Sequence, residues 1–320
     1  MAICGRPACK LCKGLCPYEA LKPEYALKAR LDAAARLLRG RARDDDLEAL
    51  LSCLACGRCL IGCPEGIDLR AILRRVYGEV GEARRAVDEY VASGTSYGAV
   101  GGVGDIALLV NEAYVPPDAW PEVDVLVRLL RRLGHSPSVH RFSDHLHIRA
   151  VYNIPMAEFE EFVGAVRSAG ADALSIDEYT GYYGRGAGVK SATRYVAELV
   201  LHGRVAATTR LPGIWVAAPP LLREVEAWVR EDVDVLVSLV PGARPLERRL
   251  VVPDLPAPFV GRGGEEEVAY HAISSYGARF HYLATTSPYL LSRLRRASRE
   301  ALCVPVLLQT LYARILEPMP

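Results

Sequence analysis

The chain has 320 residues, 51% of them apolar, and a formal net charge of +1. This length accommodates two or three domains. The balanced charge excludes a strong overall attraction to nucleic acid. No continuous apolar run is long enough to span a membrane, and the N-terminus lacks an apolar signal core, so we expect a cytoplasmic protein that reaches a membrane only through a partner subunit.

Eight of the nine cysteines form two compact motifs. The first, C-x4-C-x2-C-x3-C-P, comprises Cys4, Cys9, Cys12 and Cys16; the second, C-x2-C-x2-C-x3-C-P, comprises Cys53, Cys56, Cys59 and Cys63. The second spacing is typical of two-cluster bacterial ferredoxins, where three neighbouring thiolates bind one [4Fe-4S] cluster and the fourth binds the other. The proline favours this crossover because it turns the chain away after the fourth ligand.

Applied to this chain, the ferredoxin rule predicts two [4Fe-4S] clusters. Cluster 1 takes Cys4, Cys9, Cys12 and Cys63, and cluster 2 takes Cys53, Cys56, Cys59 and Cys16. The ligand that departs from the pattern is Cys4, because four residues instead of two separate it from the next cysteine. Structural zinc favours longer loops between ligand pairs, and a disulfide scaffold is unusual in a large intracellular chain, so iron-sulfur chemistry is the favoured interpretation. The nearby charges of Lys10, Lys13 and Arg58 should raise the reduction potentials.

The segments around the second motif are expected to be helical. Apolar residues near helical spacing predict a helix within Pro23–Gly40, acidic residues open another at Asp44–Ser52, and Asp68 precedes a third as its N-cap. A mainly helical domain with two cluster motifs resembles the α-helical ferredoxin domain of succinate dehydrogenase iron-sulfur subunits, of the C subunit of heterodisulfide reductase and of glycolate oxidase iron-sulfur subunits. We assign residues 1–94 to such a domain.

The residues after a glycine-rich linker, Gly94–Gly104, alternate between strand-like and helical patterns. The predicted strands are Asp105–Val110, Ala173–Ile176, Ile214–Ala218, Val233–Leu239 and Phe280–Ala284, and the predicted helices include Val123–Leu133, Ala157–Ser168 and Ala192–Leu201. This alternation favours α/β layers with largely parallel sheets. A pattern of helix, strand and turn over Phe162–Tyr183 recurs over Tyr270–Leu290, which indicates a tandem repeat.

A helical two-cluster ferredoxin followed by tandem α/β domains resembles iron-sulfur subunits of the heterodisulfide reductase and glycolate oxidase type, whose repeats are cysteine-rich CCG domains. The segments that carry the resemblance include Leu129–Gly134, Ala169–Ala173 and Tyr195–Gly203. The expected fold is α+β and multidomain: an N-terminal all-α helical ferredoxin domain, then two similar α/β domains at residues 95–204 and 205–320.

The C-terminal part departs from this family in its cysteines. Thr286-Ser-Pro-Tyr-Leu290 resembles the family's Thr-x-Cys-Pro-x-Cys signature with Ser287 and Leu290 in place of cysteines, and residues 64–320 contain only Cys303. Serine and leucine cannot replace several thiolates around iron, so the family's disulfide reduction is not transferred to this chain. For Cys303, in an apolar run, a buried core position is favoured over a reactive thiol.

A histidine group offers a weaker metal hypothesis. His135, His140, His145 and His147 fall within thirteen residues, and His145 and His147 would share one face of a strand. Imidazoles in that arrangement could bind zinc or iron, but histidines at strand ends are common without metal, so the structural interpretation is favoured.

The sequence therefore predicts an iron-sulfur electron-transfer subunit of an oxidoreductase complex that is not catalytic alone. It would relay single electrons to or from a protein redox partner, such as a flavoprotein, a hydrogenase-like subunit or a membrane subunit, with the α/β domains as docking scaffold. The alternative is a heterodisulfide-reductase-like or hydroxy-acid-oxidising catalytic subunit with a non-cysteine site in the α/β cleft. Clusters with a purely regulatory or structural role are a third, less favoured interpretation.

Overall fold

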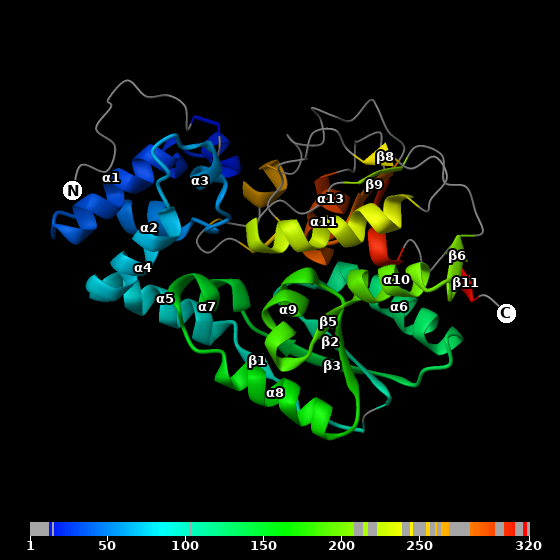
Figure 1. The fold of residues 1–320 in the computed structure, drawn as a ribbon. Helices are drawn as coiled ribbons and strands as arrows, with labels where there is room; N and C mark the ends of the chain where they lie inside the picture. The colour runs from blue at the N-terminus through cyan, green and yellow to red at the C-terminus, as the bar shows by residue number, and fades with distance from the viewer. Residues whose placement is uncertain are drawn as a thin grey trace.

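The computed structural model describes residues 13–14, 16–102, 104–207, 214–216, 223–238, 244–245, 254–256, 260, 264–268, 282–297, 304–310 and 316–318. Its fold combines helices with parallel and antiparallel strands, as expected of an α+β protein. The N-terminal helices gather on one side of the molecule and the sheets occupy the other (Figure 1).

Helices alone make up the regular structure of the described residues before position 94. They are η1 (Pro17–Ala20), η2 (Pro23–Tyr25), α1 (Leu27–Leu38), α2 (Asp46–Leu51), α3 (Arg58–Gly62), α4 (Leu69–Glu79) and α5 (Gly81–Ser93). The three helices predicted from the sequence are present. The predicted Asp68 cap is confirmed, because its carboxylate accepts a hydrogen bond from the Arg70 backbone N–H at 2.9 Å.

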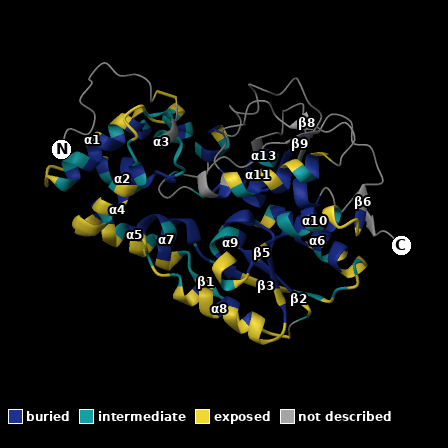
Figure 2. Cartoon of the chain, viewed as in Figure 1, coloured by how far each residue is buried: buried dark blue, intermediate teal, exposed yellow. Residues whose placement is uncertain are grey.

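These helices share one hydrophobic core. The stripe on α1 includes Leu27, Leu31 and Ala34, spaced so that they lie on one face, and it packs with Leu50 of α2 and Leu73 of α4. The outer faces of α4 and α5 carry exposed residues, as does α8 (Ala157–Ser168) farther along the chain (Figure 2). The helices thus surround a core close to the second cysteine motif.

The first sheet has five strands in the order β1-β3-β2-β4-β5. The strands are β1 (Ser96–Tyr97), β2 (Ile106–Asn111), β3 (Pro137–Ser143), β4 (Asp172–Ser175) and β5 (Lys190–Ser191). All neighbours are parallel except β1, which pairs antiparallel with β3. The segment predicted as a linker, Gly94–Gly104, therefore contributes an edge strand.

Helices cover both faces of this sheet, which explains why β2 is apolar throughout. Ile106 and Leu108 pack on the face that carries α6 (Trp120–Arg132) and α10 (Ala192–Leu201), whereas Ala107 and Leu109 pack on the face that carries α8. Alternate residues of a strand point to opposite faces, so a strand buried on both sides becomes continuously hydrophobic.

The second sheet has four parallel strands in the order β10-β9-β7-β8. They are β7 (Ile214–Val216), β8 (Arg244–Pro245), β9 (Tyr282–Thr285) and β10 (Val304–Leu307). Read from β8, the order β8-β7-β9-β10 is the same as β3-β2-β4-β5 in the first sheet. A separate antiparallel pair joins β6 (Val205–Ala207) to β11 (Leu316–Pro318).

One predicted strand is wrong. Val233–Leu239 was expected to be extended, but residues up to Ser238 belong to the helix α11 (Arg223–Ser238). The buried side chains of α11, which are Val225, Val229, Val233, Leu236 and Val237, recur at helical spacing. A short apolar run does not distinguish a strand from a helix by itself, and here its continuation toward the N-terminus decides for the helix.

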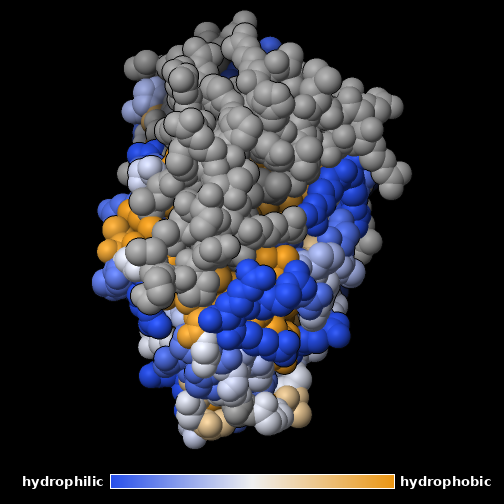
Figure 3. All heavy atoms as spheres, turned by 90° about the vertical axis from the view of Figure 1, so that its right-hand side faces the viewer, coloured by the Kyte–Doolittle hydropathy of each residue, from blue (hydrophilic) through white to orange (hydrophobic). Residues whose placement is uncertain are grey.

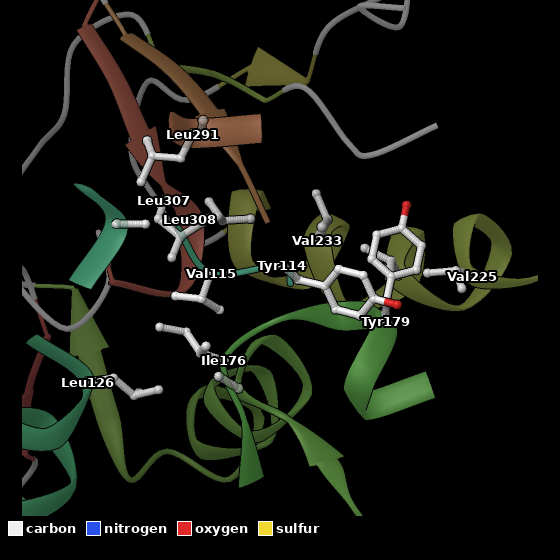
Figure 4. Packing of buried hydrophobic residues seen from close by; sticks show 14 of the residues in the cluster. Tyr114, Val115, Leu126, Ile176, Tyr179, Val225, Val233, Leu291, Leu307 and Leu308 are labelled. Atoms are coloured by element: carbon white, nitrogen blue, oxygen red, sulfur yellow. The ribbon is translucent and has the colours of Figure 1, made fainter. Parts of the chain in front are cut away.

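The two sheets share a core through the segments after their strands. Figure 4 shows Val115 and Ile176, which follow β2 and β4, near Leu307 and Leu308 at the end of β10. The amide nitrogen of Gln309 donates to the carbonyl oxygens of Ile176 at 2.8 Å and of Thr286 at 3.0 Å. The carboxyl ends of the two sheets therefore meet across this side chain.

Among the described residues, no helix is both long and apolar enough to cross a membrane. The face in Figure 3 presents hydrophilic residues interspersed with hydrophobic areas.

Candidate iron-sulfur site

Four cysteines converge on one pocket, whose lining residues all come from the N-terminal helical region. Cys16 lies just before η1, Cys53 and Cys56 lie in the loop between α2 and α3, and Cys59 lies in α3. The pocket encloses about 470 Å³, part of it open to solvent, and its wall includes Tyr18, Arg30 and Leu54. These four cysteines are the set that the sequence assigns to cluster 2.

The pocket lies on the boundary between two hydrophobic cores. Cys53 and Cys59 pack with the helical core, whereas Cys16 and Cys56 pack with the core that the two sheets share. A group bound by all four thiols would therefore be held by cysteines that pack with both cores. This position follows from Cys16, which comes from the first motif and reaches the loop of the second.

The loop that carries Cys56 has an unusual backbone. Ala55 and Gly57 flank the cysteine with φ angles of 52° and 77°, in the left-handed region that most side chains avoid. The backbone N–H of Ala55 donates to the Sγ of Cys53 at 3.3 Å. Such backbone conformations persist where the surrounding structure requires them, and here they accompany the convergence of three thiols within seven residues of chain.

Burial favours the neutral form of the pocket thiols. Burial raises the pKa of Cys53, and it raises the pKa of Cys56 to about 12. As free thiols both would stay protonated at neutral pH, but a bound metal deprotonates its cysteine ligands. The described cysteines form no disulfide.

The chemistry of the four thiols suits an iron-sulfur cluster. Cysteine thiolates are the ligands of [4Fe-4S] clusters, and four cysteines from the two motifs line this one pocket. The residues present therefore fit a [4Fe-4S] cluster.

The predicted ligands of cluster 1 are not brought together among the described residues. Cys63 ends α3 and is half-buried, and it is not part of the wall of the four-cysteine pocket. Cys4, Cys9 and Cys12 lie outside the described residues, as does Cys303. The assignment of cluster 1 thus stays a prediction.

The two histidines considered for an extra metal do not lie on a strand. His145 is the N-cap of α7 (Leu146–Tyr152) and His147 lies in its first turn, so the expected strand geometry is wrong. The Nδ1 of His147 is 3.0 Å from the hydroxyl of Tyr114, and the ring of His145 stacks on Tyr90 at 4.5 Å. Burial lowers the pKa of both, that of His145 to about 4. Among the described residues, no third ligating side chain joins them.

At Ser287, a position that resembles a CCG cysteine, the side chain makes hydrogen bonds instead. Ser287, which follows β9, accepts a hydrogen bond from the Leu290 backbone N–H at 3.1 Å and donates to the Asp254 carbonyl at 3.0 Å. After the corresponding strand β4 of the first sheet, Asp177 accepts from the Thr180 backbone N–H at 2.7 Å. Both side chains cap the helix that follows.

A second pocket opens where the two sheets meet. It encloses about 770 Å³, part of it open to solvent, and is lined by residues after β2, by Pro256, Val260 and Glu265, and by Tyr289, Arg293 and Arg296 of α13 (Pro288–Ala297). Arg293 on α13 is buried, and its Nη2 lies 2.8 Å from both Glu265 and the hydroxyl of Tyr289. The carboxyl ends of parallel strands are where open α/β sheets usually bind ligands.

Tyr18 forms part of the wall of the cysteine pocket and is 1% exposed. Burial raises its pKa, and the charges of Glu265 and Tyr289 raise it further. Among described buried side chains, its hydroxyl is one of those without a hydrogen-bond partner.

Sequence reasoning missed Arg30 and Tyr18. Arg30 lies between Leu27 and Leu31 on the apolar face of α1. A charged residue on an apolar helix face indicates that the charge is buried and needs a partner, so the sequence could have identified it. Tyr18 follows a Cys-Pro pair and carries no comparable signal.

Comparison with known proteins agrees with the cysteine site. Residues 6–68 match the family described as "4Fe-4S dicluster domain". This region is an iron-sulfur, ferredoxin-like domain that binds [4Fe-4S] clusters, and it gives the chain a role in iron-sulfur electron transfer. The match covers both cysteine motifs except Cys4.

The remaining comparisons add little. No curated protein matches the chain. Among solved structures, the chain is similar to the myo-inositol binding protein of Caulobacter bound to myo-inositol, with 13% identity over 63% of this chain and 72% of that one and a TM-score of 0.25. This similarity is too low to bear on fold or function.

Proposed function

We propose that the chain relays single electrons through two [4Fe-4S] clusters, and that Cys16, Cys53, Cys56 and Cys59 bind one of them. The observation that carries the proposal is the convergence of these four thiols, from both motifs, on one pocket. Cys4, Cys9, Cys12 and Cys63 would bind the other cluster, as the crossover rule requires. Bound clusters would supply one-electron transfer, and the protein's residues would set their position and potential.

We further propose that the α/β part is the docking scaffold for a protein redox partner. Its support is the position of the four-cysteine pocket, since Cys16 and Cys56 pack with the core that the sheets share. An electron on this cluster would be close to the α/β part rather than confined to the helical side. The partner would be a flavoprotein, a hydrogenase-like subunit or a membrane subunit, and any membrane contact would go through it.

A native pull-down combined with a dye assay tests this role. We expect the chain to copurify in a fixed ratio with a redox subunit and to be inert alone toward disulfides and hydroxy acids with an artificial electron acceptor. Turnover by the isolated, cluster-loaded chain would contradict the scaffold role.

The second pocket supports the alternative, in which the chain is itself catalytic. Buried Arg293, Tyr289 and Glu265 line a hollow at the carboxyl ends of the strands, where a small organic substrate would bind. Activity of the isolated chain that Arg293→Met abolishes, with iron content unchanged, would favour this alternative.

A further inference from the structure

Arg30 is a buried arginine that points into the four-cysteine pocket. Its side chain is 2% exposed and makes three hydrogen bonds. Nε donates to the Ala49 carbonyl at 2.9 Å, Nη2 to the Ser52 hydroxyl at 3.0 Å, and Nη1 to the Cys16 Sγ at 3.5 Å. All three contacts hold the planar guanidinium in one orientation toward the sulfur.

None of these partners carries a full negative charge in a metal-free protein. Among the described residues, no carboxylate lies within ion-pair distance of Arg30. Other buried arginines do have such a partner: Arg149 lies 2.9 Å from Asp144, and Arg293 lies 2.8 Å from Glu265. Burying a charge without an anionic partner is costly, so an anion in the pocket would stabilise Arg30.

The cysteine pocket is the place from which that anion would come. A [4Fe-4S] cluster with four thiolate ligands has a net negative charge, and one-electron reduction makes it more negative by one unit without making or breaking a bond. A fixed positive charge and a hydrogen bond to a ligand sulfur both stabilise the reduced form more than the oxidised form.

We propose that Arg30 is a positioning residue for the cluster at Cys16, Cys53, Cys56 and Cys59: it is the buried counter-charge that helps the cluster assemble and raises its reduction potential. This inference rests on the proposed function. Arg30 should affect only this cluster, because it contacts Cys16, which is a ligand of this cluster and not of the other. Lys28, two residues before Arg30 on α1, is exposed, so its charge is screened by solvent.

The test is an anaerobic redox titration of both clusters, followed by electron paramagnetic resonance, with dithionite as reductant. The variants are Arg30→Met, which removes the charge, and Arg30→Lys, which keeps it. Lys28→Met is the matched control, because it removes an exposed charge from the same helix two residues away. We expect Arg30→Met to shift one of the two potentials to a more negative value, Arg30→Lys to restore most of the shift, and Lys28→Met to change neither.

If Arg30→Met fails to load one cluster, the iron content of the two variants distinguishes an effect of the charge from an effect of side-chain shape. Full iron in Arg30→Lys beside half the iron in Arg30→Met supports the counter-charge, whereas equal loss in both variants shows that shape matters and overturns it. Two loaded clusters with unchanged potentials in Arg30→Met also overturn it. Those results leave the proposed function intact, while a parent protein without clusters would defeat the proposed function itself.

Discussion

The four-cysteine pocket and the carboxyl ends of the two sheets both place polar side chains in the interior, but these side chains have different partners. In both regions, polar side chains lie in the interior where strands or loops end. The pocket gathers thiols beside an arginine, which together suit a metal cluster. At the sheet ends, Ser287 and Asp177 instead bond to backbone N–H groups of the next helix. A helix cap needs only one acceptor, whereas a cluster needs several thiolates, so the second region can persist without metal.

The four-cysteine pocket should therefore depend on its cofactor, whereas the sheet ends should not. The capping side chains Ser287 and Asp177 have their hydrogen-bond partners in the folded chain, whereas Arg30 and the thiols of the pocket would gain an anionic partner only with a bound cluster. Loss of the metal should therefore affect the two regions very differently.

The largest effect should follow from removing one thiol of the pocket. We expect Cys59→Ala to lose about half of the iron, because the cluster of that pocket loses a ligand while the other cluster keeps all of its own. Iron and acid-labile sulfide per chain are the measurements. Cys303→Ala, a change outside both motifs, should leave both values at the parent level; equal iron in the two variants would contradict the assignment of Cys59.

The next effect is a dependence of the free energy of unfolding on pH, caused by two buried carboxyl groups. Burial raises the pKa of Asp254 and of Glu178 to about 8 each, well above their values in an unfolded chain. The folded state then holds these protons between about pH 4 and pH 8 while the unfolded state releases them. Stability should therefore fall as pH rises through this window, by up to about 1.4 kcal/mol per pH unit for each group.

Asp254→Asn should remove one of these two contributions and so flatten the fall. Denaturant unfolding at several pH values measures the slope. Asp124→Asn, which alters an exposed carboxylate on α6, serves as the control and should keep the parent slope. A parent protein whose stability rises over this range would show that these carboxyls are ionised in the folded state.

A smaller effect is expected from the caps at the sheet ends. Ser287→Ala removes the acceptor for the Leu290 N–H and should lower the free energy of unfolding by about 1 kcal/mol, with iron content unchanged. Ser238→Ala, at the exposed end of α11, should cost less. If Ser287→Ala reduced the iron content, the separation between the two regions would be wrong.

Much of this molecule could be predicted from local sequence pattern, because the relevant forces are local. The cap at Asp68 and the helix Ala157–Ser168 depend on neighbouring residues, and the structure has them where they were expected. The helix containing Val233 was mistaken for a strand because a short apolar run fits both periodicities.

The parts that escaped prediction depend on distant residues. The role of Arg30 becomes visible only when α1 is folded against the loops that hold Cys16 and Ser52. The effect of Glu265 on the pKa of Tyr18 joins residues almost 250 positions apart. No periodicity in the sequence encodes such contacts, because they arise from tertiary packing.

The most direct test of the account is a metal and sulfide analysis of the full chain purified without oxygen, together with its visible spectrum. Two [4Fe-4S] clusters predict about eight iron and about eight acid-labile sulfide per chain, and an absorbance at about 400 nm that bleaches with dithionite. A colourless protein that contains zinc and no acid-labile sulfide would contradict the account.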